Sequence, residues 1–277
     1  MEEPPVTKIG ILGCGAIGSE IAAAVCDRKV GNASLVALFD QDAEIASSLA
    51  RRLPITVPAF TNIGQFLAVS GIEMVVECAS PGAVRAYAEA VLSSGRDLLM
   101  ISSGALTDTT LFHRLAALAE GRGRRLIIPS GALGGIDAIR AARGSLEEVT
   151  LTTTKPPNGL KGAPGFKDWE SVEITEPQVI FEGPALEAIK LFPANVNVGA
   201  TLSLVSLGPE KTIVKVVADP HSPGNVHEIY ARGDFGVMRF TLQNRPHDRN
   251  PRTSYLAMLS AIETLRAACT PGPSIGT

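Results

Sequence analysis

The segment Lys8-Ile-Gly-Ile-Leu-Gly-Cys-Gly-Ala-Ile-Gly-Ser-Glu20 carries the strongest fold signal in the chain. Its apolar residues Ile9–Leu12 predict a buried strand, and an alanine-rich helix follows over Ile21–Val25. Three glycines stand between them in the spacing G-x-G-x-x-G. The first permits a tight turn, the second lets the backbone approach a pyrophosphate, and the third lets helix and strand pack closely. Because a helix N-terminus favours anions, the segment predicts a dinucleotide-binding loop made by Gly13, Gly15, Ala16, Ile17 and Gly18.

An acidic residue follows the second predicted strand. Leu35–Phe39 is apolar and ends in Asp40, about 20 positions after the last glycine of the loop. A carboxylate there accepts both ribose hydroxyls of an adenosine and repels a 2′-phosphate, so we expect NAD as cofactor. One acid does not exclude NADP. The alternative is a turn that binds no nucleotide, with Asp40 capping the next helix; strand, helix and acid together favour the cofactor.

Composition limits the classes of protein and partner. The chain has 277 residues, 45% hydrophobic and 19% charged, which suits two modest domains. A net charge of −3 argues against nucleic acid and acidic membrane surfaces as partners. The first residues, Met1–Pro5, lack the features of a signal peptide, and no apolar run approaches the roughly 18 residues of a membrane span. We therefore expect a cytoplasmic protein.

The four cysteines form no C-x-x-C pair. Their spacing fits neither a zinc site nor a disulfide framework. We expect all four to be small buried apolar residues, and we predict no metal site.

Residues 1–130 alternate between predicted strands and helices joined by short loops. The strand over Glu73–Cys78 runs into a small-residue turn, and we expect Cys78, Ala79 and Ser80 to line the cofactor crevice at its carboxyl end. Such alternation is typical of a parallel sheet with helices on both faces. The predicted fold class is therefore α/β: a Rossmann domain with a doubly wound parallel sheet over residues 1–130.

Residues 131–250 have a different pattern. Most of their predicted strands alternate apolar and polar residues, as in a sheet with one solvated face. We predict a second, α+β domain that carries an open mixed sheet, the substrate site and a homodimer interface on its exposed face. Residues 251–277 hold a last helix, expected to pack back on the first domain. The loop Pro156–Gly165 looks too polar and too broken to pack, and it is equally compatible with a flap or a surface loop.

A dehydrogenase needs a group that handles a proton, and histidine suits that role. The chain has four: His113, expected to face solvent on a helix; His221, in a turn; His227, at a strand start; and His247, in a charged loop. Spacing alone singles out none of them.

Several motifs together resemble the L-aspartate dehydrogenase family across nearly the full length. They are Gly10–Gly18, Val75–Ser80, Pro129–Asp137, Phe192–Thr201, Ala218–Pro220, Asn225–Ile229, Gly233–Gly236 and Asn250–Ser254. The resemblance implies NAD(P)-dependent oxidative deamination of L-aspartate to iminosuccinate, which hydrolyses to oxaloacetate and ammonia. It also implies a supply of iminosuccinate to the quinolinate branch of NAD biosynthesis.

Matched position by position, the family's active-site histidine corresponds to His227, and its cofactor contacts to Ala132 and Asn197. The resemblance therefore favours His227 over His221. Three roles stay open for His227: taking the ammonium proton, orienting the substrate, or assisting the attack of water.

The two carboxylates of aspartate need cationic or N–H partners, because leaving them unpaired in a desolvated site is costly. Lys155, Lys161, Arg245 and Arg252 are candidate cations. Asn195, Asn197 and Thr201 offer neutral hydrogen bonds. We take Asn195, Thr201 and Lys155 as the candidate substrate-binding residues.

Two rival hypotheses remain. The first is a related two-domain oxidoreductase acting on another small acid or on a sugar, since one pocket change can alter the substrate. The second is an NAD-binding sensor without catalysis, which would bind the cofactor without turnover.

Overall fold

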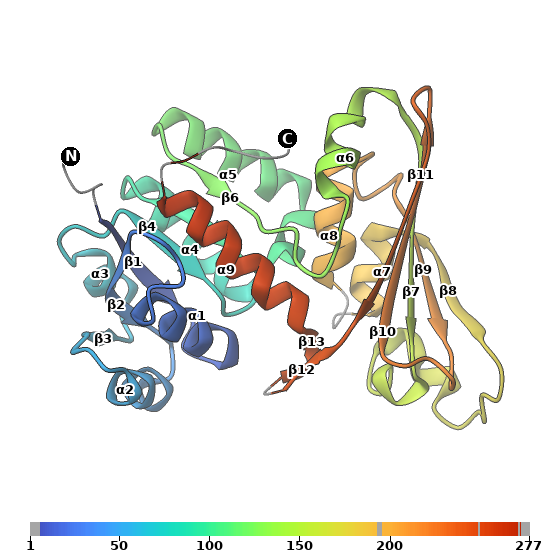
Figure 1. Ribbon diagram of the computed structural model, residues 1–277, viewed down its shortest axis with the longest axis horizontal. Helices are drawn as coiled ribbons and strands as arrows, with labels where there is room; N and C mark the ends of the chain where they lie inside the picture. The colour runs from blue at the N-terminus through green and yellow to red at the C-terminus, as the bar shows by residue number, and fades with distance from the viewer. Residues whose placement is uncertain (1–5, 193–195, 249, 271, 273–277) are drawn as a thin grey trace. The chain divides into compact units, whose positions relative to one another are not determined.

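The computed structural model describes residues 6–192, 196–248, 250–270 and 272 (Figure 1). The chain divides into two compact units. Unit 1 comprises Met1–Pro129 and Met258–Ser274, and unit 2 comprises Ser130–Ala257 and Ile275–Thr277.

Unit 1 contains a six-stranded parallel sheet in the order β3-β2-β1-β4-β5-β6. This is the order of a doubly wound dinucleotide-binding fold, and it confirms the predicted Rossmann class. Its elements are β1 (Thr7–Leu12), α1 (Ala16–Cys26), β2 (Ala33–Phe39), α2 (Ala43–Arg52), β3 (Ala59–Phe60), α3 (Ile63–Leu67), β4 (Met74–Glu77), α4 (Pro81–Ser93), β5 (Asp97–Met100), η1 (Ser103–Thr107), α5 (Thr109–Gly121), β6 (Leu126–Ile127) and α9 (Tyr255–Cys269).

The core of unit 1 is mostly aliphatic and joins distant parts of the chain. The buried residues of α9, Met258, Ala261, Leu265 and Cys269, belong to the same cluster as those of β1 and α1. Arg125 also binds the end of α9, because its guanidinium donates to the carbonyl of Ala268 and pairs with Asp97. The last helix is thus part of this unit's core from Met258 onward.

Unit 2 contains a five-stranded mixed sheet in the order β11-β10-β7-β9-β8. β7 and β9 are parallel and the other neighbours are antiparallel. Its elements are α6 (Ile136–Ala141), η2 (Arg143–Ser145), β7 (Leu146–Lys155), η3 (Pro157–Gly159), η4 (Pro164–Trp169), β8 (Gln178–Pro184), α7 (Ala185–Leu191), α8 (Val196–Val205), β9 (Ile213–Ala218), β10 (Asn225–Gly233), β11 (Gly236–Asn244), β12 (Pro246–His247) and β13 (Asn250–Ser254).

Alternation along the strands gives this sheet two unlike faces. α6, α7 and α8 lie on one face (Figure 1), and Val149, Leu151, Val214, Val216 and Ile229 of that face are buried in the core. The opposite face carries half-buried and exposed side chains. The open mixed sheet predicted from the period-2 pattern is confirmed.

Two local expectations are wrong, and one short hairpin was not predicted. The segment Pro156–Gly165 does pack, since Leu160 is buried in the unit 2 core and η3 lies within the segment. One apolar side chain suffices to anchor a loop that is otherwise polar. The hairpin of β12 and β13 gave no period-2 signal because its first strand has only 2 residues. Cys26 is half-buried, whereas Cys14, Cys78 and Cys269 are buried.

Candidate functional site

A cavity of about 530 Å³ lies in unit 1 at the carboxyl ends of β1, β2 and β4. Strand order reverses there, because β1 has β2 on one side and β4 on the other, and open α/β sheets bind ligands at such switch points. The cavity is lined by Leu12, Gly13, Gly15, Phe39, Asp40, Gln41, Cys78, Ala79, Ser80, Gly82, Ala83 and Tyr87.

The three glycines of the loop are required for different reasons. Gly13 has a φ of +103°, and a Cβ on it would lie 2.7 Å from the backbone nitrogen of Ala79. A Cβ on Gly18 would lie 1.8 Å from the carbonyl oxygen of Gly13. A Cβ on Gly15 would meet no atom of the described chain within 4 Å. Packing thus explains Gly13 and Gly18, whereas Gly15 leaves open space at the cavity wall for a ligand.

The start of α1 suits an anion. Gly15 is its N-cap, no side chain of the described residues caps it, and its first turn, which begins with Ala16 and Ile17, holds no acidic residue. A helix N-terminus with these properties is ready for a pyrophosphate. Together with the open space at Gly15, it shows that the residues present fit a dinucleotide.

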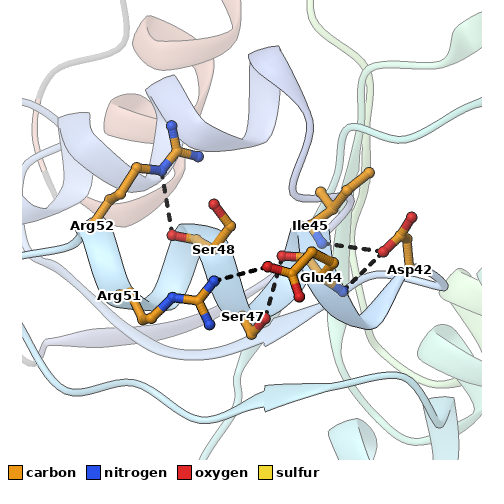
Figure 2. A network of polar contacts seen from close by, with 7 residues as sticks. All are labelled: Asp42, Glu44, Ile45, Ser47, Ser48, Arg51 and Arg52. Atoms are coloured by element: carbon orange, nitrogen blue, oxygen red, sulfur yellow. Dashed lines mark hydrogen bonds and ion pairs between the residues drawn. The ribbon is translucent and has the colours of Figure 1, made fainter.

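Asp40 lines the cavity in a fixed orientation. One carboxylate oxygen accepts the N–H of Cys14 at 2.8 Å and the other accepts the N–H of Asp42 at 3.0 Å. A carboxylate has further lone pairs for ribose hydroxyls. The alternative in which Asp40 caps the next helix is wrong: Figure 2 shows that Asp42 caps α2, with its carboxylate accepting the N–H groups of Glu44 and Ile45.

Glu77 is a buried carboxylate in this region that the sequence reasoning missed. It accepts hydrogen bonds from the backbone N–H groups of Ala79, Ser80 and Ser102 and from the hydroxyl of Ser102. Burial raises its pKa, and these hydrogen bonds oppose the rise. Glu77 thereby joins the turn after β4, which lines the cavity, to the turn after β5. The available signal was an acid at the end of an apolar strand.

The other residues that sequence reasoning missed line the same cavity. Gln41 follows Asp40 directly, and its side-chain amide donates to the hydroxyl of Tyr87 at 2.8 Å. Gly82 and Ala83 lie in the first turn of α4, about one turn before Tyr87. Their positions next to predicted residues were the available signal.

The two cysteines of this region are not nucleophiles. Burial raises the pKa of Cys14 to about 12, and burial raises the pKa of Cys78 well above its ordinary value. A thiol reacts as its thiolate, so both behave as small apolar residues at neutral pH.

Unit 2 has a polar cluster on the helix-covered face of its sheet, formed by Thr153, Lys155 and His227. Thr153 on β7 pairs in register with His227 on β10, and Lys155 follows on the same face of β7. The Oγ1 of Thr153 lies 3.1 Å from Nδ1 of His227 in a hydrogen bond. The exposed fractions are 1% for Thr153, 4% for Lys155 and 3% for His227.

The two basic groups of this cluster both have pKa values well below their ordinary values. Burial lowers the pKa of Lys155 to about 8. Burial and, to a lesser degree, the charge of Lys155 lower the pKa of His227 to about 4. Within the described chain, the ammonium group of Lys155 has no ion pair or hydrogen bond. The cluster therefore holds an imidazole that is neutral at physiological pH beside an amine whose pKa is close to physiological pH.

The other candidate residues are placed differently. His113 and His221 are exposed, and His247 is buried with its ring stacked on Tyr255. Lys161 and Arg245 are exposed. Asn195 and the side chain of Arg252 lie outside the described residues.

Three candidates come from elements of unit 2 other than its sheet. Ala132 is buried, and its carbonyl accepts the side-chain amide of Asn244 at 3.1 Å. Asn197 is exposed in the first turn of α8, and Thr201 is buried one turn later. In the part of the chain that is described, no three His, Cys, Asp or Glu side chains gather as metal ligands would, and no helix is long and apolar enough to cross a membrane.

The sheet order, the glycine loop and Asp40 define a dinucleotide-binding protein of the Rossmann class. Comparison with known families agrees: residues 13–129 match the family described as homoserine dehydrogenase, NAD binding domain, and residues 137–268 match aspartate dehydrogenase, C-terminal. Unit 1 is therefore an NAD-binding domain.

Full-length relatives identify the family. The chain is 46% identical to an L-aspartate dehydrogenase of Methanosarcina barkeri and 41% identical to one of Nitrosopumilus maritimus; each match covers 98% of this chain and 99% of the relative. The solved aspartate dehydrogenase of Thermotoga maritima is 28% identical, with a TM-score of 0.76 over 97% of this chain and 99% of that one. The chain belongs to the L-aspartate dehydrogenase family.

More distant structures share the fold alone. GenD2 of gentamicin A biosynthesis, solved in complex with NAD, is 15% identical, with a TM-score of 0.58 over 97% of this chain and 86% of that one.

Proposed function

We propose that this protein is an NAD-dependent L-aspartate dehydrogenase that oxidises L-aspartate to iminosuccinate. The observation that carries the proposal is the buried cluster of Thr153, Lys155 and His227, in a chain that matches a family member over 98% of its length. A buried lysine without a carboxylate partner in the described chain favours an anionic ligand, and aspartate brings two carboxylates.

The cofactor is held by unit 1 in this proposal. The backbone of Gly13, Gly15, Ala16, Ile17 and Gly18 binds the pyrophosphate, and Asp40 binds the adenosine ribose. Cys78, Ala79 and Ser80 form the wall after β4. Ala132 and Asn197 are the family's cofactor positions in the second domain. When bound, NAD⁺ supplies the acceptor for the hydride that leaves the substrate Cα.

The substrate is bound by residues of the second domain. We assign His227 as the catalytic residue, with Lys155, Thr201 and Asn195 as substrate contacts. The hydrogen bond between Thr153 and His227 fixes the imidazole ring and occupies Nδ1, which leaves Nε2 for the substrate. In this proposal residues 1–130 bind the cofactor, residues 131–250 bind substrate and dimerise, and residues 251–277 complete the first domain.

The test is the initial rate of NADH formation by purified protein. L-aspartate should support turnover, whereas L-glutamate, L-alanine and L-malate should not. His227→Ala should lower kcat by roughly 100-fold or more, as expected for loss of a group that contacts the reacting centre. Turnover with another small acid, or NAD binding without any turnover, would instead favour one of the two rival hypotheses.

The finer biological context is also a proposal. Val179 and Val237 are exposed on the open face of the unit 2 sheet, which favours a homodimer through that face; the solution mass from light scattering tests it. The cysteines are all free thiols, as in the reducing cytoplasm. We further propose that iminosuccinate feeds quinolinate synthesis, which complementation of a strain lacking its own iminosuccinate source tests.

A further inference from the structure

The proton that must leave the substrate ammonium needs an acceptor near the bound substrate. Resting on the proposed function, we propose that Lys155, and not His227, accepts this proton, while His227 stays neutral and orients the substrate. In this step an N–H bond of the ammonium breaks, a new N–H bond forms at Nζ of Lys155, and the substrate keeps the lone pair on its nitrogen. Neutral amine becomes ammonium on the enzyme, so charge and protons balance.

The buried polar groups of unit 2 leave few alternatives. Within the described residues they are Thr153, Lys155, Thr201, Ser203, Ser206, Thr212, His227, Asn244, His247 and Ser254, and none is a carboxylate. His247 lies on β12, where it pairs in register with Asn250 and stacks on Tyr255. Lys155 and His227 are therefore the titratable pair on the helix-covered face of the sheet.

The geometry favours Lys155 within this pair. Nδ1 of His227 is bonded to Thr153, which holds the ring in one orientation and suits Nε2 to orienting the substrate. The stem of Lys155 lies against the η3 turn, since a Cβ on Gly159 would lie 3.7 Å from the Cβ of Lys155. Its ammonium group is left without an acceptor in the described chain, so burial makes Lys155 give up its proton more readily than an exposed lysine does.

No carboxylate among the described residues of the neighbouring elements pairs with Lys155 and stabilises its protonated form. From β10 the facing titratable group is His227. Asp219, after β9, donates its backbone N–H to the carbonyl of Lys155, but its carboxylate accepts the N–H of His221. The η3 turn and α8 contain no charged residue, and the charged side chains of α7, Glu187 and Lys190, are exposed.

The relative basicities agree with this division of roles. Efficient proton acceptors have pKa values near the working pH. The pKa of Lys155 is about 8, whereas that of His227 is about 4. An imidazole with so low a pKa is a poor acceptor for the proton of an alkylammonium, although it remains a good hydrogen-bond partner.

The kinetic test compares Lys155→Arg with the wild type. Arginine keeps the positive charge but cannot take a proton. The wild-type kcat/KM should rise with pH through about 8. The variant should lose roughly 100-fold or more in kcat, while its affinity for succinate, a dicarboxylate without the amine, changes only a few-fold. Lys190→Arg, on exposed α7, is the matched control and should leave both quantities unchanged.

Two further readouts keep the proposal falsifiable if arginine does not fit. Methylamine should restore turnover to Lys155→Ala, and the pKa of His227 measured by NMR should rise in Lys155→Met, since the nearby charge is gone. The proposal would be overturned if the fall in kcat/KM below about pH 8 persisted in Lys155→Arg or disappeared in His227→Gln. Loss of succinate affinity in step with kcat would also overturn it, because Lys155 would then only bind. If the wild type does not oxidise aspartate, the proposed function fails, yet the NMR measurement still tests the Lys155–His227 coupling.

Discussion

Lys155 and Glu77 are both buried ionisable residues, but their surroundings differ. The carboxylate of Glu77 accepts four hydrogen bonds from two turns, so its charge is compensated inside the fold. Lys155 has no such partner in the described chain. A buried charge without a partner is costly, and proteins keep such groups at functional sites at the expense of stability.

Replacing Lys155 by methionine should therefore stabilise the protein at neutral pH. The pKa of Lys155 in the folded state, about 8, lies below its ordinary value of 10.5, so the folded state binds the proton less tightly than the unfolded state. The penalty is complete below pH 8 and disappears as the pH rises toward 10.5, and at 1.36 kcal/mol per pKa unit it is roughly 3 kcal/mol. Urea unfolding of Lys155→Met at pH 7 and pH 10 measures it. A gain equal at both pH values would contradict the electrostatic origin.

Asp40 should make the enzyme selective for NAD over NADP. Its carboxylate accepts the N–H groups of Cys14 and Asp42, so turning away from a 2′-phosphate would break both hydrogen bonds. No lysine or arginine lines the described cavity, and Figure 2 shows that Arg51 and Arg52 of α2 bind Glu44 and the carbonyl of Ser48.

Fluorescence titration should give an affinity for NADH roughly 100-fold or more above that for NADPH, since like charges in contact cost several kcal/mol. Asp40→Asn should lower the ratio of the NADH affinity to the NADPH affinity, whereas Glu44→Gln, at a residue outside the cavity lining, should leave it unchanged. Equal affinities in the wild type would show that Asp40 does not set the preference.

At the scale of elements, different glycines of the loop serve packing and ligand binding. Gly15→Ala places its methyl group in open space, so stability should change little while NAD affinity falls by roughly 10-fold or more, because the methyl group occupies the pyrophosphate approach. Gly18→Ala should destabilise the fold by several kcal/mol, because its Cβ would meet the backbone of Gly13. Thermal unfolding and NADH titration of both variants test the pair. Equal loss of stability in the two would contradict the assignment.

Elements whose signal is local were predictable, and those that depend on distant contacts were not. The βα units of the first domain follow from hydrophobic periodicity and glycine turns. The packing of Leu160 depends on tertiary contacts that no local pattern encodes. The pairing of Thr153 with His227 depends on strand register between residues 74 positions apart, so the sequence indicated the histidine only through family resemblance.

At the scale of the whole molecule, each unit contributes a different chemical capability. Unit 1 offers a cavity, a helix N-terminus and a ribose-binding acid, which fit NAD. Unit 2 offers a neutral imidazole and a poised amine on a rigid sheet, which fit an amino-acid substrate. Family membership joins the two in one reaction, the oxidation of the C–N bond of aspartate.

The most direct test of that reaction follows the hydrogen on the substrate Cα. Incubation of the protein with NAD⁺ and L-aspartate deuterated at Cα should yield NADH that carries the deuterium, as measured by mass spectrometry. The initial rate should fall relative to unlabelled aspartate if this step limits turnover. Formation of NADH without the label, or no NADH at any pH between about 7 and 10 around the pKa of Lys155, would contradict the assignment of an aspartate dehydrogenase.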